Sequence, residues 1–137
     1  MTPWPLPAAF PPTLAGCVLA ILAFDAIAAA LARRFPSVKY GSLWPLQFGC
    51  YVAFGFVAMF ELLDVRFAAA IGAITGLIEA TLGWAITWRI GPGRQPNTNA
   101  ATIAIAVGSM VAFGFGLALL GAFVLNAAIL VELRLHR

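Results

Sequence analysis

The chain has 137 residues, of which 63% are hydrophobic and only 9% are charged, and its net charge is +3. A soluble domain carries about 25% charged residues, so a water-soluble fold of this size cannot bury this much apolar surface. The composition therefore predicts an all-α polytopic membrane protein with one domain. The eight basic residues are scattered, with no cluster that could follow a phosphate backbone, so we expect no nucleic-acid partner.

Residues 1–12 contain five prolines: Pro3, Pro5, Pro7, Pro11 and Pro12. Proline cannot occupy a regular helix interior, so we expect this segment to be a tail at the membrane interface. The first membrane helix is predicted over residues 13–33, with Thr13 as its N-cap. Its one charge before the final turn is Asp25. Two basic residues at its end suit the headgroup level and serve as interfacial anchors, Arg33 and Arg34.

The second helix is predicted over residues 43–63. Trp44 at its start is a further interfacial anchor, and Pro45 is tolerated because it falls in the first helical turn. The link to the next predicted helix is very short, around residues 64–66. A link of this length makes the second and third helices antiparallel neighbours.

The third helix is predicted over residues 67–89, and one face of it carries small residues and an acid. Gly72, Gly76, Glu79 and Gly83 fall at i, i+4, i+7 and i+11. Such small-residue spacing lets another helix backbone approach closely, so we expect Glu79 to point into a helix–helix contact or a cavity. Three residues near the end of this helix are predicted interfacial anchors: Trp84, Trp88 and Arg89.

The fourth helix is predicted over residues 101–131. Thirty-one residues span about 46 Å, which exceeds the ~30 Å hydrocarbon core of a bilayer. The helix should therefore tilt, kink or project. Three of its glycines are predicted helix-packing positions: Gly108, Gly114 and Gly116. The four helices together predict an up-down bundle that forms one transmembrane domain over residues 13–137.

The sequence Val-Ala-Phe-Gly-Phe occurs at residues 52–56 and again at residues 111–115. One interpretation is a parallel duplication of a two-helix hairpin. The other is chance, because these residue types dominate membrane helices. With spans of 13–33 and 68–88, Asp25 and Glu79 are the thirteenth and twelfth residues of helices that run the same way. We therefore expect both acids at one level near the bilayer midplane under either interpretation.

A carboxylate at that depth is costly in lipid and needs a partner, a proton or a function. Apart from Arg33 and Arg89 at the helix ends, no lysine, arginine or histidine lies inside a predicted span to neutralise Asp25 or Glu79. Two carboxyl groups close together in a medium of low polarity can share protons and can exchange them for a cation. They are the predicted proton- or cation-binding residues. The alternative is that Glu79 is protonated and only hydrogen-bonds a neighbouring helix.

Enzymatic signals are missing from the sequence. It has no HExxH, P-loop, CxxC or GxSxG motif. The one histidine, His136, is next to last in the chain, so no span offers a histidine for haem. Cys17 and Cys50 lie in apolar runs and are interpreted as packing residues. We therefore expect no enzyme activity, no bound metal and no cofactor.

Two functions remain. The first is a small, oligomeric transporter or channel that moves protons or small cations past Asp25 and Glu79. The second is a non-catalytic accessory subunit of a larger membrane complex, which would pack through its glycine and alanine helix faces. The expected partners are the lipid bilayer and either further copies of the chain or other membrane subunits.

Orientation follows from the basic residues in short loops. One side of the predicted bundle carries five of them: Arg33, Arg34, Lys39, Arg89 and Arg94. The other side carries three, with acidic residues nearby: Arg66, Arg134 and Arg137. This distribution predicts a bacterial inner-membrane protein with both termini outside.

Cysteine labelling tests this orientation. With a cysteine in place of Lys39 or of Gln95, a thiol reagent that cannot cross membranes should leave both positions unlabelled in intact cells, because both loops are predicted to be cytoplasmic. Labelling of either position from outside would contradict the orientation.

Overall fold

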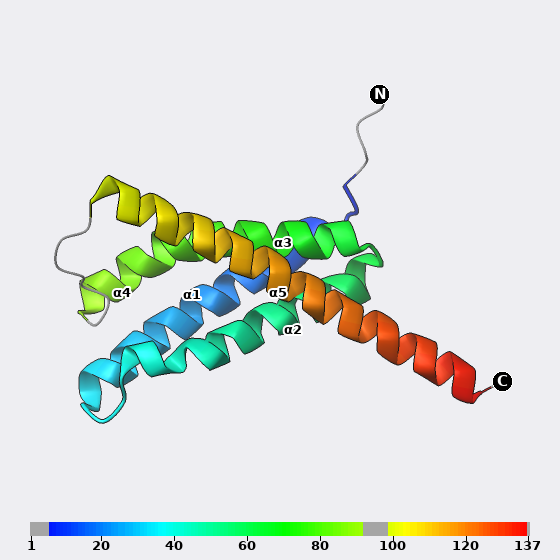
Figure 1. Cartoon of the computed structure of the whole chain (residues 1–137), viewed down its shortest axis with the longest axis horizontal. Coiled ribbons are helices and arrows are strands. Elements are labelled where there is room, and N and C mark those ends of the chain that lie inside the picture. Colours follow the sequence, from blue (N-terminus) through cyan, green and yellow to red (C-terminus); the bar gives the residue numbers. More distant parts are fainter. Residues whose placement is uncertain (1–5, 92–98, 137) are drawn as a thin grey trace.

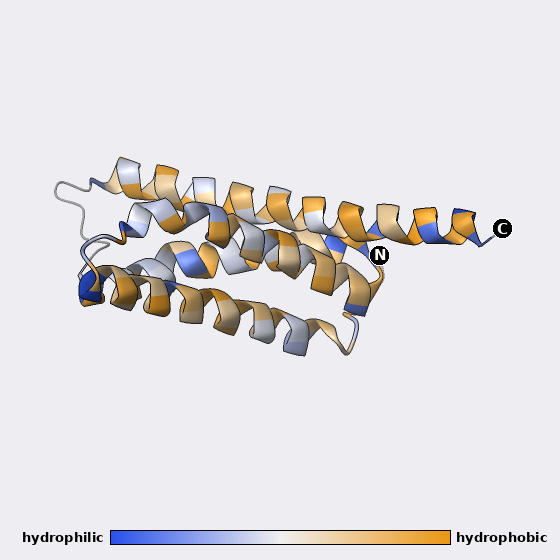
Figure 2. Cartoon of the chain, turned by 90° about the horizontal axis from the view of Figure 1, so that it is seen from below, coloured by the Kyte–Doolittle hydropathy of each residue, from blue (hydrophilic) through white to orange (hydrophobic). Residues whose placement is uncertain are grey.

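A computed structural model describes residues 6–91 and 99–136 of the chain. Helices are the only regular secondary structure in these residues. Four helical stretches are long and apolar enough to cross a membrane: Phe10–Arg34, Tyr40–Leu62, Val65–Ile90 and Ala100–Leu135. This confirms an all-helical chain with four candidate membrane spans. Successive stretches run in opposite directions in Figure 1, and apolar residues recur along all of them in Figure 2.

Helix α1, Phe10–Arg34, begins three residues before the predicted start. Pro11 and Pro12 fit its first turn, where the missing amide hydrogen is not needed for a helical hydrogen bond. The prediction that residues 10–12 belong to a non-helical tail is therefore wrong. So is the N-cap role of Thr13, because its hydroxyl donates to the carbonyl of Ala9, at 2.7 Å, from inside the helix.

Helix α2, Trp44–Leu62, follows a short 3₁₀ turn at Tyr40–Leu43. It ends at Leu63, whose left-handed backbone (φ 54°) closes the helix. Asp64 then caps α3, Val65–Ile78, because its Oδ1 accepts the Arg66 amide at 2.8 Å. That hydrogen bond, together with those of the Arg66 guanidinium, lowers the pKa of Asp64 below its ordinary value. Helices α2 and α3 run in opposite directions and contact each other, which confirms the prediction that they are antiparallel neighbours.

The third predicted helix is continuous from Val65 to Ile90 but is not regular. A five-residue π-helical turn, Glu79–Gly83, joins α3 to α4, Trp84–Ile90. A π turn inserts an extra residue into the helical spacing and is frequent at functional sites. Gly91 ends α4 with a φ of 126°, a backbone conformation that glycine adopts without strain.

Helix α5, Ala100–Leu135, has 36 residues. Asn99 is its N-cap, because the Asn99 side chain accepts a hydrogen bond from the Thr102 amide. At 1.5 Å per residue it is about 54 Å long. Figure 1 shows it crossing α2 and α3 and then continuing past the turn that joins them. The helix extends further than residues 101–131 on both sides, and its projection from a bilayer stays a prediction.

Close backbone approach holds α5 against α2 and α3. A methyl group added at Gly72 would overlap the carbonyl of Gly114, and one added at Gly114 would overlap the carbonyl of Gly72. One added at Gly76 would lie 2.5 Å from the carbonyl of Met110. Gly72, Gly76 and Gly114 are therefore helix-packing residues, as predicted. Gly55, against the carbonyl of Ala118, belongs to the same kind of contact.

Two other predicted packing glycines, Gly108 and Gly116, are exposed, with open space where a side chain would be. Neither glycine makes a helix contact within the described residues, so a packing role for them stays a prediction. The reason is helical geometry: at 3.6 residues per turn, Gly116 lies on nearly the opposite side of α5 from Gly114.

The repeated Val-Ala-Phe-Gly-Phe segments occupy different surroundings. Gly55 and Gly114, which correspond in the two segments, both make close backbone contacts. Phe54 is buried, whereas the corresponding Phe113 is 47% exposed. The duplication therefore stays a prediction.

Alanine substitutions at two neighbouring glycines of α5 test this packing. Gly114→Ala should lower the stability by about 1–3 kcal/mol, because the methyl group overlaps the Gly72 backbone. Gly116→Ala should leave it unchanged or raise it by up to about 1 kcal/mol, because alanine favours the helix. Unfolding of the detergent-purified protein measures both. Equal shifts at the two positions would contradict the packing of α5.

Candidate functional site

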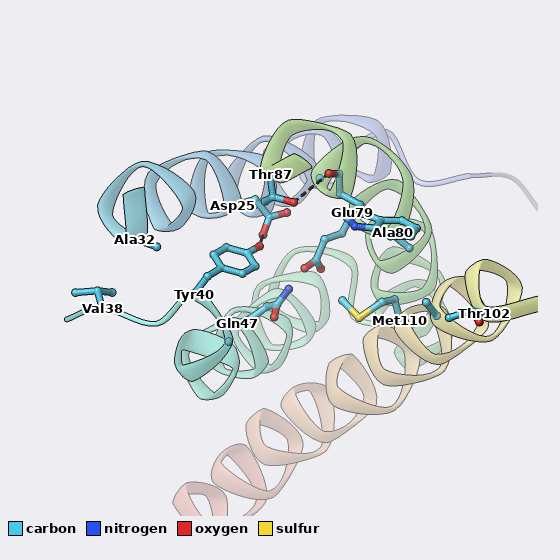
Figure 3. A pocket seen from close by; sticks show the side chains of 14 residues that line it. Asp25, Ala32, Val38, Tyr40, Gln47, Glu79, Ala80, Thr87, Thr102 and Met110 are labelled. Carbon is cyan, nitrogen blue, oxygen red and sulfur yellow. Dashed lines mark hydrogen bonds between the residues drawn. The ribbon is translucent and has the colours of Figure 1, made fainter. Parts of the chain in front are cut away.

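Asp25 and Glu79 line one cavity of about 560 Å³, formed between α1, α2, α4 and α5 (Figure 3). Asp25 is the sixteenth of the 25 residues of α1, and Glu79 is the fifteenth of the 26 residues of Val65–Ile90. Their side chains are 1% and 3% exposed. The structure thus brings the two acids together near the middle of their helices.

Tyr51 of α2 donates a hydrogen bond from its hydroxyl to Oε2 of Glu79. Tyr51 is itself 1% exposed. The sequence reasoning missed this partner. One signal was available, because a buried tyrosine needs a partner for its hydroxyl group and Tyr51 lies well inside an apolar helix.

Tyr40 of the 3₁₀ turn donates a hydrogen bond to Oδ1 of Asp25, at 3.3 Å. The other carboxyl oxygen, Oδ2, is buried and has no hydrogen-bond partner in the described part of the chain. An unpaired buried polar atom is costly, so Oδ2 of Asp25 is a place where a proton or a cation would be stabilised.

Gly83 has a different role from the one predicted. A methyl group at this position would overlap Oδ2 of Asp25 and would lie 3.1 Å from Cγ of Glu79. Gly83 is therefore buried against α1, as predicted for this face, but its nearest neighbour is a carboxyl side chain and not a helix backbone. The π turn changes the spacing after Glu79, so that Gly83 makes room for the two carboxyl groups.

The cavity opens at one end of the molecule. Gly41 and Thr102 line it and are exposed, so the space reaches the surface near the link between α1 and α2. Toward the opposite end, a core of buried side chains that includes Cys17, Ile21 and Ile71 closes the molecule. The cavity that the two acids line is therefore open near this end of the molecule.

Several predicted interfacial anchors lie at this open end. Arg33 donates to the carbonyl of Ile90, at 3.4 Å, and so connects the end of α1 to the end of α4. Arg34 and Arg89 are exposed there, as is Trp44 at the start of α2. Arg94 and Gln95 lie outside the described residues.

The two tryptophans of α4 are stacked, with ring centroids 6.3 Å apart. Trp88 is 50% exposed, as an interfacial anchor would be. Trp84 in addition lines the cavity, a role that the sequence did not indicate. The indole therefore belongs to the surroundings of the two acids.

The lining also contains uncharged polar groups. The amide of Gln47 and the hydroxyl of Thr87 face the same space as the two acids in Figure 3. None of the described residues that line the cavity is a lysine, arginine or histidine. The described residues also contain no cluster of three or more histidine, cysteine or acidic side chains that would hold a metal ion. The arrangement thus concentrates uncompensated acidic groups in a buried, partly polar space.

Comparisons of the chain with protein-family models, with curated proteins and with solved structures found no significant match. The chemistry of the site therefore has to be argued from its own geometry.

A double-mutant cycle tests whether the Tyr51 hydroxyl stabilises the Glu79 carboxyl group. Tyr51→Phe should lower the stability by about 1–3 kcal/mol, because a buried acceptor loses its donor. In a Glu79→Leu background the same change should cost much less, because no acceptor is left unpaired. Unfolding in detergent gives the four values, and equal costs in the two backgrounds would contradict the pairing.

Proposed function

We propose that this chain is an integral membrane protein that moves protons or small cations past Asp25 and Glu79. In this proposal its four long helices cross the bilayer as an up-down bundle. One observation carries the proposal: two buried carboxyl groups from different helices share a cavity whose described lining has no basic residue. Ionisable groups at such depth are a signature of ion and proton pathways.

Protons and cations compete for the same carboxyl oxygens in this mechanism. A cation that enters from the open end meets Oδ2 of Asp25, which has no partner in the described residues. The other titratable groups bonded to the two acids are Tyr40 and Tyr51, whereas the described part of α5 contributes Thr102, Ala106 and Met110 to the lining. Acidification should therefore release the cation by protonating Asp25 and Glu79.

The closed side of the cavity favours a carrier over an open channel. Ile21 and Ile71 have no exposed surface and lie in the core between the acids and the opposite end. Transport would require this core to open while the other end closes. The π turn at Glu79–Gly83 is a candidate hinge, because irregular helical turns absorb changes in backbone conformation.

The proposal includes self-association and an orientation. Gly108 and Gly116 present small, open surfaces on α5, and small residues let membrane helices approach one another closely. The basic residues near the open end, Arg33, Arg34 and Arg89, favour the cytoplasmic side for this end. In a bacterial inner membrane this would leave both termini outside.

The second candidate is an accessory subunit of a larger membrane complex. The hydrogen bond from Tyr51 to Glu79 favours it, because a neutral Glu79 could serve only to join α2 to α3. Such polar contacts between membrane helices contribute roughly 0.6–2 kcal/mol each. In this case the acids would not exchange protons during function.

Proton flux in reconstituted vesicles distinguishes a transporter from an accessory subunit. The wild-type protein should couple a cation gradient to proton movement, reported by a pH-sensitive dye. Glu79→Gln should reduce the flux to that of protein-free vesicles, because the amide keeps the shape but cannot release a proton. Glu79→Asp should retain part of the flux, and Asp25→Asn should weaken it.

Glu61→Gln is the matched control, because Glu61 is exposed near the other end of α2 and lines no part of the site. It should behave like the wild type. A wild-type protein without flux under any gradient, together with a stable and normally assembled Glu79→Gln variant, would favour the accessory subunit.

A further inference from the structure

The cavity is much larger than a proton or a single inorganic ion requires. Its volume is about 560 Å³, whereas a water molecule occupies about 30 Å³ in the liquid. Sites for organic ligands have volumes of about 300–1,000 Å³. The size therefore corresponds to an organic molecule.

The charged part of the lining selects a cation. Asp25 is 99% buried, and its Oδ2 lies against Gly83, which lines the cavity, without a hydrogen-bond partner in the described residues. Glu79 approaches the same point through its Cγ. Buried acidic groups of this kind attract positive charge, and the described lining offers no basic side chain that would bind an anion.

The donor set does not suit a dehydrated divalent metal ion. Calcium takes six to eight oxygen ligands and magnesium needs an octahedral set. Only two carboxyl side chains are available here, and the described residues form no larger acidic, histidine or cysteine cluster. Most contacts of the ligand must therefore come from groups other than the two carboxyl groups.

Much of the rest of the lining is aromatic or apolar, beside the polar side chains of Gln47, Thr87 and Thr102. Tyr40 contributes a ring beside Asp25, and Met110 contributes a polarizable thioether on the α5 side (Figure 3). Trp84 contributes a second aromatic ring to the lining. Aromatic faces attract cations, and most strongly those with diffuse charge and little hydration. Methionine adapts its shape to apolar groups.

We infer that the cavity binds an organic cation, a protonated amine or a quaternary ammonium or phosphonium group with an apolar body. The cationic centre lies between Asp25 and Glu79, and the body contacts Trp84 and Met110. This inference rests on the proposed function and specifies its substrate class. Protons then compete with the organic cation for the same two carboxyl groups.

Binding of tetraphenylphosphonium to the detergent-purified protein tests the inference, with tetraphenylborate as an anion of the same shape. Isothermal titration calorimetry should show saturable binding of the cation and none of the anion. Glu79→Gln and Trp84→Leu should each lower the affinity for the cation by about tenfold or more. This is the equivalent of losing one charge-assisted or cation–aromatic contact. Lowering the pH from about 8 to about 5, toward the titration range of carboxyl groups, should also lower this affinity, because protons compete with the cation.

The control variant Glu61→Gln should bind the cation as the wild type does. Equal binding of the two probes, or cation binding that Glu79→Gln leaves unchanged, would overturn the inference. Proton flux that depends on Glu79, in a protein that does not bind tetraphenylphosphonium, would also overturn it and would leave the proposed function standing. Cation binding with the expected sensitivities, in a protein without flux, would support the site and count against transport.

Discussion

The cost of burying two carboxyl groups within apolar helices is the constraint on which this structure depends. Asp25 and Glu79 are nearly inaccessible, and the described residues around their cavity include no basic side chain. Two tyrosines and a cavity provide the compensation instead. Tyr51 and Tyr40 each donate to one carboxyl oxygen, whereas Oδ2 of Asp25 lies against Gly83 without a partner in the described residues. In the proposed function, a cation or a proton in the cavity would complete the interactions of the two acids.

Helix packing makes this cavity possible. Apolar side chains gain little by leaving lipid for protein, so membrane helices associate through close backbone packing and polar contacts. Gly72, Gly76 and Gly114 bring α5 against α3. Near the cavity, the π turn and Gly83 open the packing just where the acids meet. Tight packing of α5 against α3 thus lies beside an open space that reaches the surface near the link between α1 and α2.

Much of this architecture could be predicted from the sequence, because the length and hydropathy of a membrane helix are local properties. The four spans and the common level of Asp25 and Glu79 follow from them. The tyrosine partners and the lining role of Trp84 could not, because they depend on how distant helices pack. Regular helical spacing also did not show the π turn or the contact of Gly83 with the Asp25 side chain. It could not show which face of α5 turns inward, so Gly108 and Gly116 were placed in contacts that the chain does not make.

The central claim is that Glu79 exchanges a proton for a cation. Infrared difference spectroscopy of the purified protein measures this directly, because a protonated carboxyl group absorbs apart from a carboxylate. Adding a cationic ligand at constant pH should convert a protonated carboxyl band into a carboxylate band, and Glu79→Gln should remove that change. A carboxyl spectrum that does not respond to any cation, or a response that persists in Glu79→Gln, would contradict the account.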